Sequence, residues 1–159
     1  MSENTERLQA ARELLDTKKK LLEAKIREYQ GLSQADSIVL LDIKEEFIAM
    51  HYEFFDLEIR SMGFFKKMGV KTKSAQNVKY MELKMEKDPD TGRSPSNEWC
   101  HIKANIATGE EQIDEVDAEI IYKGFRMIRD TAQKWLDQII QKISVVKSEE
   151  FNSRNTGAA

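Results

Sequence analysis

The fold of this chain is decided by the segment LLDIKEEFIAMHYEFFDL at residues 40–57. Its apolar residues return at alternating steps of three and four, which is the spacing of one face of an α-helix. The residues on this face are Leu40, Ile43, Phe47, Met50, Phe54 and Leu57. A second apolar line, with Leu41, Ile48 and Phe55, runs beside the first. A stripe this wide predicts a helix that packs against more than one neighbour, as in a helical bundle.

The segment before this helix predicts an antiparallel partner for it. Apolar residues recur at helical spacing along residues 3–30. Gly31 is a natural stop, because glycine readily adopts the left-handed conformation that ends many helices. Ser33 or Asp36 then offers a side-chain oxygen to cap the next helix. We therefore expect a helical hairpin over residues 3–68.

The middle of the chain has a weaker pattern. We expect the second helix to end near Gly63 or Gly69, and residues 69–97 to form a basic connector followed by a loop that holds both prolines. Residues 78–87 favour helix over strand, because Lys, Glu and Met dominate there and β-branched residues are scarce. A short β-hairpin across residues 78–106 is the alternative, since apolar residues alternate on both sides of the loop.

Residues 98–151 predict a long helical region without proline. Ser96 or Asn97 can cap its start. A break is expected at Thr108 and Gly109, because a glycine costs about 1 kcal/mol in a helix interior. The apolar seam expected to pack in the bundle consists of Trp99, Ile102, Ile106, Ile113, Val116, Ile120, Ile128, Ala132, Trp135, Ile139, Ile143 and Val146.

Together these elements predict one all-α domain over residues 1–151, an elongated helical bundle with an N-terminal hairpin and a long C-terminal helix. Residues 152–159 are small and polar and predict a disordered tail. The seams carry more apolar surface than one chain is expected to cover, so we expect a homo-oligomer. The residues expected at its interface are Trp99, Ile128, Trp135, Ile139 and Ile143.

The composition excludes several classes of protein. The chain is 40% hydrophobic and 33% charged, with seven glycines and two prolines, which is typical of long solvated helices. The net charge of −3 argues against a polycation that coats nucleic acid. No apolar run reaches the roughly 18 residues of a membrane span. Since the first residues also lack the apolar core of a secretory signal, we expect a cytoplasmic protein.

No arrangement of residues predicts catalysis. The glycines are isolated, so no phosphate-binding loop is present, and the single cysteine excludes an intramolecular disulfide. Glu98 and His101 match the Glu-x-x-His unit of di-iron bundles. The second such unit is missing, because Phe47 and Ile48 stand where a carboxylate partner of His51 would lie. We expect no enzyme, no metal site and no cofactor.

The charge pattern marks a candidate binding segment. Six basic residues and no acidic one lie between residues 60 and 79. Cations attract phosphates and aromatic faces stack unpaired bases, so we treat this segment as a candidate nucleic-acid surface. Its residues are Arg60, Phe65, Lys66, Lys67, Lys71, Lys73, Lys79 and Tyr80. A solvated helix face over a packed core is the competing interpretation.

An acidic segment follows, with six carboxylates within residues 110–119. Apolar Ile113 and Val116 lie within this segment and Ile120 follows it directly. Acid and base can pair within one chain or between subunits. The apolar seams and the missing chemistry favour a non-enzymatic oligomeric adaptor or assembly protein that acts through protein–protein contacts. The alternative is an accessory protein that loads or remodels single-stranded DNA or RNA through residues 60–80.

Overall fold

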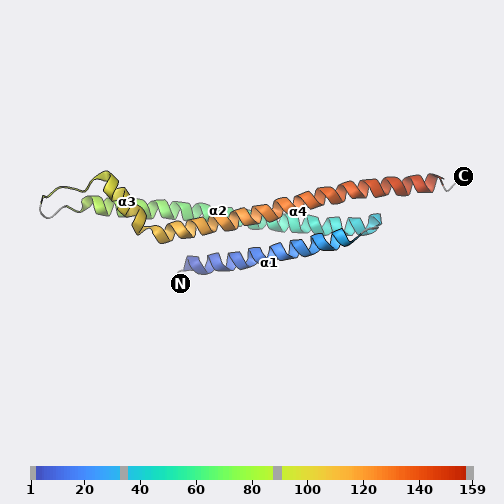
Figure 1. The fold of residues 1–159 in the computed structure, drawn as a ribbon, viewed down its shortest axis with the longest axis horizontal. Coiled ribbons are helices and arrows are strands. Elements are labelled where there is room, and N and C mark those ends of the chain that lie inside the picture. The colour runs from blue at the N-terminus through green and yellow to red at the C-terminus, as the bar shows by residue number, and fades with distance from the viewer. Residues whose placement is uncertain (1–2, 33–35, 88–90, 157–159) are drawn as a thin grey trace. The chain divides into compact units, whose positions relative to one another are not determined.

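The computed structural model describes residues 3–32, 36–87 and 91–156, with side chains up to Arg154. Within these residues the chain forms four α-helices and no strand (Figure 1). The helices are α1 (Glu3–Gly31), α2 (Ser37–Met85), α3 (Asn97–Ala107) and α4 (Gly109–Thr156). The predicted all-α helical bundle is confirmed. No helix in these ranges is both long enough and apolar enough to cross a membrane.

The helices divide into two compact units. Unit 1 comprises residues 1–11 and 60–122, and unit 2 comprises residues 12–59 and 123–159. The three long helices contribute residues to both units, whereas α3 belongs to unit 1 alone.

In unit 2, α1 and α2 form the predicted antiparallel hairpin. Lys18 Nζ lies 2.5 Å from Glu53 Oε1, and Lys25 Nζ lies 2.7 Å from Glu46 Oε2. The pairs advance along α1 while they retreat along α2, as antiparallel helices require. The carboxylates of Glu46 and Glu28 raise the pKa of Lys25 by accepting its hydrogen bonds.

The ends of this hairpin match the sequence signals in part. Asp36 caps α2, since its Oδ1 accepts hydrogen bonds from the backbone N–H groups of Ile38 and Val39 at 3.0 and 2.9 Å. Ser33, the other predicted cap, lies outside the described residues. Helix α1 ends at Gly31 as predicted, but without the left-handed conformation, which among the described glycines only Gly92 adopts.

Large apolar side chains fill the core of unit 2. Phe47 and Phe54 of α2 and Phe125 of α4 are almost fully buried, and the Tyr29 ring meets the Trp135 ring edge-on at 5.8 Å. Helix α4 runs antiparallel to α2 here, because the Ser37 hydroxyl donates to Glu150 at 3.1 Å and Glu58, later in α2, pairs with Arg129, earlier in α4. The seam predicted for this part of α4 is confirmed by the burial of Ile128, Ala132, Ile139 and Ile143.

The predicted end of the second helix is wrong. Helix α2 passes through Gly63 and Gly69 and continues to Met85, so residues 69–85 of the predicted connector are helical. In unit 1 this extension packs on α4, where the Thr72 hydroxyl lies 3.1 Å from the Glu111 carbonyl oxygen. Packing of this kind offsets the roughly 1 kcal/mol that each glycine costs in a helix interior.

The β-hairpin alternative for residues 78–106 is also wrong. Its two halves lie in α2 and α3, and no strand occurs in the described residues. The predicted helix start is confirmed, because Ser96 Oγ accepts a hydrogen bond from the Trp99 N–H at 3.2 Å. The predicted break is confirmed as well, since Thr108 stands at the C-cap of α3 and α4 begins at Gly109.

The predicted disordered tail is wrong for residues 152–156, which belong to the last turns of α4. The Ser153 hydroxyl donates to the Glu150 carbonyl at 2.9 Å, a local bond that small hydroxyl residues make inside helices. Residues 157–159 lie outside the described part of the chain.

Candidate functional site

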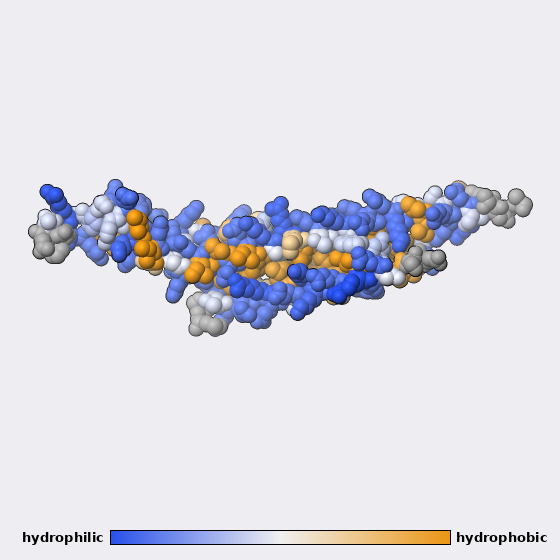
Figure 2. Space-filling model, in the orientation of Figure 1, coloured by the Kyte–Doolittle hydropathy of each residue, from blue (hydrophilic) through white to orange (hydrophobic). Residues whose placement is uncertain are grey.

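Helix α3 and the first turns of α4 carry large apolar side chains on the surface of unit 1. Sequence spacing predicted that they would form the packed seam, but all of them are between 42% and 69% exposed. We call this set the apolar stripe, and it consists of Trp99, Ile102, Ile106, Ile113, Val116 and Ile120. Figure 2 shows apolar residues on the surface over these elements. The seam prediction is therefore wrong for this part of the chain.

The opposite face of the same two helices is buried, and apart from Ile121 of α4 its residues are small. Cys100 and Ala104 of α3 pack against Leu83 of α2, and Ala118 of α4 is buried farther along. Small side chains let helices approach closely, and dispersion contacts grow with that approach. Thr108 belongs to the same face, and its hydroxyl donates to the Ala104 carbonyl at 2.9 Å. This close packing leaves the larger isoleucines on the outside.

Acidic residues flank the part of the stripe that lies on α4. The carboxylates that lie beside Ile113, Val116 and Ile120 on the surface of the helix are those of Glu110, Asp117 and Glu119. A shallow hollow in this surface is lined by Gly109, Gln112, Ile113, Val116 and Asp117. The α4 part of the stripe is therefore an apolar surface with an acidic border.

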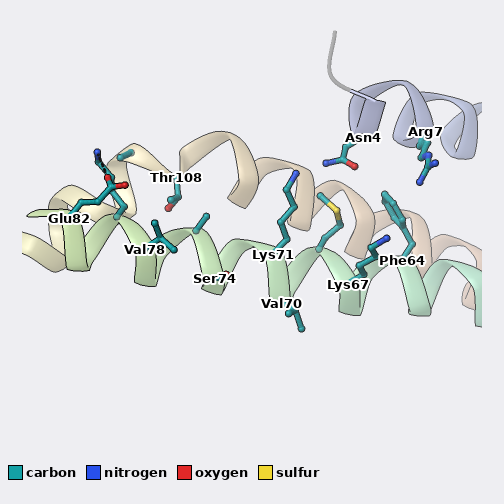
Figure 3. Close-up of a pocket in the computed structure, with 14 residues that line it drawn as sticks. Asn4, Arg7, Phe64, Lys67, Val70, Lys71, Ser74, Val78, Glu82 and Thr108 are labelled. Carbon is teal, nitrogen blue, oxygen red and sulfur yellow. Dashed lines mark hydrogen bonds and ion pairs between the residues drawn. The ribbon is translucent and has the colours of Figure 1, made fainter.

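A basic groove of about 690 Å³ runs along α2 within unit 1. Its apolar lining includes Phe64, Met68, Ala75 and Val78. Figure 3 shows Asn4 and Arg7 of α1 beside one part of the groove and Thr108 farther along it. Lysines at positions 67, 71 and 79 also line it, together with one carboxylate, Glu82.

The structure separates the six predicted basic contacts into different surfaces. Lys67 and Lys71 lie in the groove, whereas Lys66 and Lys73 are exposed outside its lining. Arg60 is exposed as well. Residues four apart lie on the same face of a helix, as Lys67 and Lys71 do, and residues seven apart also lie on the same face, as Lys66 and Lys73 do. The two lysine pairs lie on different faces of α2. The basic segment is therefore not one continuous surface.

Lys79 also lines the groove, but its charge is used within α2. Its Nζ lies 2.9 Å from Glu82 Oε2, and this hydrogen bond raises the pKa of Lys79. Arg7, the remaining cation of the lining, pairs with Glu3 at 2.7 Å. The unmatched charge of the groove therefore comes from Lys67 and Lys71.

Both aromatic residues proposed to stack on bases already stack within unit 1. The Phe65 ring is parallel to the Tyr122 ring, with centroids 6.2 Å apart. Tyr80 stacks on His101 at 4.4 Å, and its hydroxyl is 3.3 Å from Asn97 Oδ1. Both rings therefore have one face covered by the chain itself.

The predicted oligomer interface falls mainly on residues that unit 2 uses internally. Ile128, Ile139 and Ile143 are buried in its core, and Trp135 packs against Tyr29. In this fold they have little surface to offer a second chain. Trp99 is exposed in unit 1, where Lys103 lies over its ring at 5.8 Å.

The Glu-x-x-His pair is not joined by further ligands. Among the described residues, no group of three or more His, Cys, Asp or Glu side chains is placed to hold a metal ion. The His101 ring is stacked on Tyr80, and Cys100 beside it is buried and unpaired. These residues pack together in α2 and α3.

Sequence reasoning missed the groove, although a signal for it was present. Phe64, Met68, Lys71, Ala75 and Val78 recur at steps of four and three, and Lys67 lies beside Met68 on the same side of the helix. Because the helix was expected to end at Gly63 or Gly69, this spacing was not interpreted as a helix face. Comparison of the chain with family models, with curated proteins and with solved structures finds no match.

Proposed function

We propose that this chain is a non-enzymatic assembly protein that works as an oligomer through protein–protein contacts of its helices. The observation that carries the proposal is the apolar stripe on α3 and α4. Five isoleucine and valine side chains there are more than half exposed. Contiguous exposed apolar surface with a polar border is typical of interaction sites.

The energetics favour a protein partner for this surface. Burial of an isoleucine or valine side chain contributes about 1.5–3 kcal/mol relative to full exposure. Covering Ile113, Val116 and Ile120, which are each about half exposed, would therefore add several kcal/mol to association. The acidic border around them disfavours contact with phosphates, because like charges repel.

The proposal is tested by sedimentation equilibrium over a wide range of protein concentration. We expect the unmodified chain to associate, and the variant Ile113→Ser, Val116→Ser, Ile120→Ser to sediment as a monomer. These side chains are exposed, so circular dichroism should show an unchanged helix content. The variant should not associate, because serine side chains bury much less apolar area in a contact than isoleucine and valine do.

A matched control replaces the same residue types on the surface of unit 2. Ile38→Ser, Ile140→Ser and Val145→Ser also remove two isoleucines and one valine that are exposed, and this variant should associate like the unmodified chain. A chain that stays monomeric at high concentration, or a control variant that dissociates equally, would contradict the proposal.

Binding of single-stranded nucleic acid is the second candidate function. One observation favours it: Lys66, Lys67, Lys71 and Lys73 have no hydrogen bond or ion pair with any other described residue. The covered faces of Phe65 and Tyr80 count against it. Fluorescence anisotropy of a labelled oligonucleotide distinguishes the two functions, since phosphate binding weakens steeply with salt.

A further inference from the structure

We infer that the basic groove of unit 1 receives the acidic, apolar surface of α4 from a second copy of this chain. The inference rests on the proposed function and names the surface that the apolar stripe contacts. It is carried by the shape of the groove, by the charges on both surfaces and by the direction in which the stripe faces.

The groove has the form of a seat for a helix. In unit 1 the first turns of α1 bury Leu8 and place Asn4 and Arg7 along the groove, while the lining continues along α2 as far as Glu82 (Figure 3). From Phe64 to Glu82 a helix rises about 27 Å at 1.5 Å per residue. The segment from Ile113 to Ile120 rises about 11 Å, so it fits within this length.

The charges of the two surfaces are complementary. The groove contains Lys67 and Lys71, and the α4 surface contains Glu110. Within the described ranges, no hydrogen bond or ion pair of these three side chains is present. The apolar parts match as well, since Met68, Ala75 and Val78 can cover isoleucine and valine. Such complementarity directs association and sets register.

The stripe cannot meet the groove of its own chain. Ala118 and Ile121 form the buried face of α4 in unit 1. Val116 and Ile120 each lie two residues from Ala118, which places them on the opposite side of a helix with 3.6 residues per turn. The stripe thus faces away from the α2 helix that bears the groove. A second copy supplies a groove that the stripe can reach, and it brings a second stripe. An isologous dimer or a head-to-tail array can be built from these contacts.

The experiment is a charge reversal at each surface, read by sedimentation equilibrium. The groove variant is Lys67→Glu with Lys71→Glu, and the stripe variant is Glu110→Lys with Asp117→Lys. Each variant alone should associate at least about 10-fold more weakly than the unmodified chain, because like charges then face one another. An equimolar mixture of the two variants should restore association, because opposite charges face one another again.

The matched control is Lys66→Glu with Lys73→Glu, which makes the same change of charge on the same helix outside the groove. This control should associate like the unmodified chain, and circular dichroism should show that all variants keep their helix content. If the control weakens association as much as the groove variant, or if the mixture stays dissociated, the inference is overturned.

The outcomes separate this inference from the proposed function. Association that depends on Ile113, Val116 and Ile120 but is indifferent to reversal at Lys67 and Lys71 leaves the assembly function standing and removes the groove from it. A monomeric unmodified chain removes both. Salt-sensitive binding of a labelled single-stranded oligonucleotide that only the groove variant loses would assign the groove to nucleic acid and overturn the inference.

Discussion

Units 1 and 2 draw on the same three long helices but bury different kinds of side chain. Unit 2 encloses Phe47, Phe54 and Phe125, so its helices are held together by large apolar contacts. Unit 1 also encloses Leu8, Met68 and Leu83, but the buried faces of α3 and of the start of α4 consist mainly of small residues such as Cys100 and Ala104, and the apolar stripe lies on the surface. The difference teaches that the buried face of a helix is not always its most apolar face, because close approach also contributes dispersion energy.

The polar contacts between helices differ in the length of the side chains that make them. Ion pairs connect neighbouring helices in unit 2, including Lys18 with Glu53 and Glu58 with Arg129. In unit 1 the buried hydroxyl of Thr72 connects α2 to α4 through backbone carbonyls. A hydroxyl is shorter than a lysine or arginine side chain, and it suits helices whose facing residues are small.

The largest expected effect tests the core of unit 2. Phe54→Ala removes a fully buried ring and should lower the free energy of unfolding by about 3–5 kcal/mol. Phe55→Ala is the matched control, because the neighbouring ring is 43% exposed, and it should cost about 1 kcal/mol or less. Urea denaturation followed by circular dichroism measures both. If both variants lose the same free energy of unfolding, the burial of Phe54 in this fold is contradicted.

A smaller effect is expected from the polar contact in unit 1. Thr72→Val keeps the shape of the side chain but removes the hydroxyl between Met68 and Glu111, which should cost about 1 kcal/mol. Thr17→Val removes an exposed hydroxyl that bonds only to its own helix, and it should change the free energy of unfolding by less than about 0.5 kcal/mol. If Thr72→Val is as mild as the control, the hydroxyl does not stabilise unit 1.

The smallest effect concerns two helical glycines. A Cβ added at Gly63 meets no atom within 4 Å, whereas one added at Gly124 in unit 2 meets the Leu15 side chain. Gly63→Ala should therefore raise the free energy of unfolding by up to about 1 kcal/mol. Gly124→Ala should give a smaller gain or a loss, because Leu15 must move. The reverse order in thermal denaturation would contradict the packing of α1 on α4 in unit 2.

Much of the secondary structure could be predicted, because its signals are local. The period of residues 40–57 identified α2, and the observed caps Asp36 and Ser96 were each one of two candidates recognised by residue type and position. Thr108 and Gly109 marked the break between α3 and α4. Each of these features depends on side chains and backbone groups within a few residues of one another.

The candidate site was harder to predict, because it depends on contacts between distant segments. Gly63 and Gly69 look like a helix end when only their neighbours are considered. In unit 1 the helix instead continues to Met85 and packs on α4 through Thr72 and Glu111, and its residues between Phe64 and Glu82 line the groove. The lysines were recognised as a charged segment, but only the folded helix shows which of them share a face.

By itself, the sequence determined that this protein is helical and where most of its helices begin, since period, caps and breakers act locally. Only the tertiary structure decided which face of α3 and α4 is buried. Both faces have helical spacing, one with Ile113 and Val116 and the other with Ala104 and Ala118. Hydropathy favours the first, but close packing against α2 selects the second, because the contact energy depends on how nearly two helices can approach.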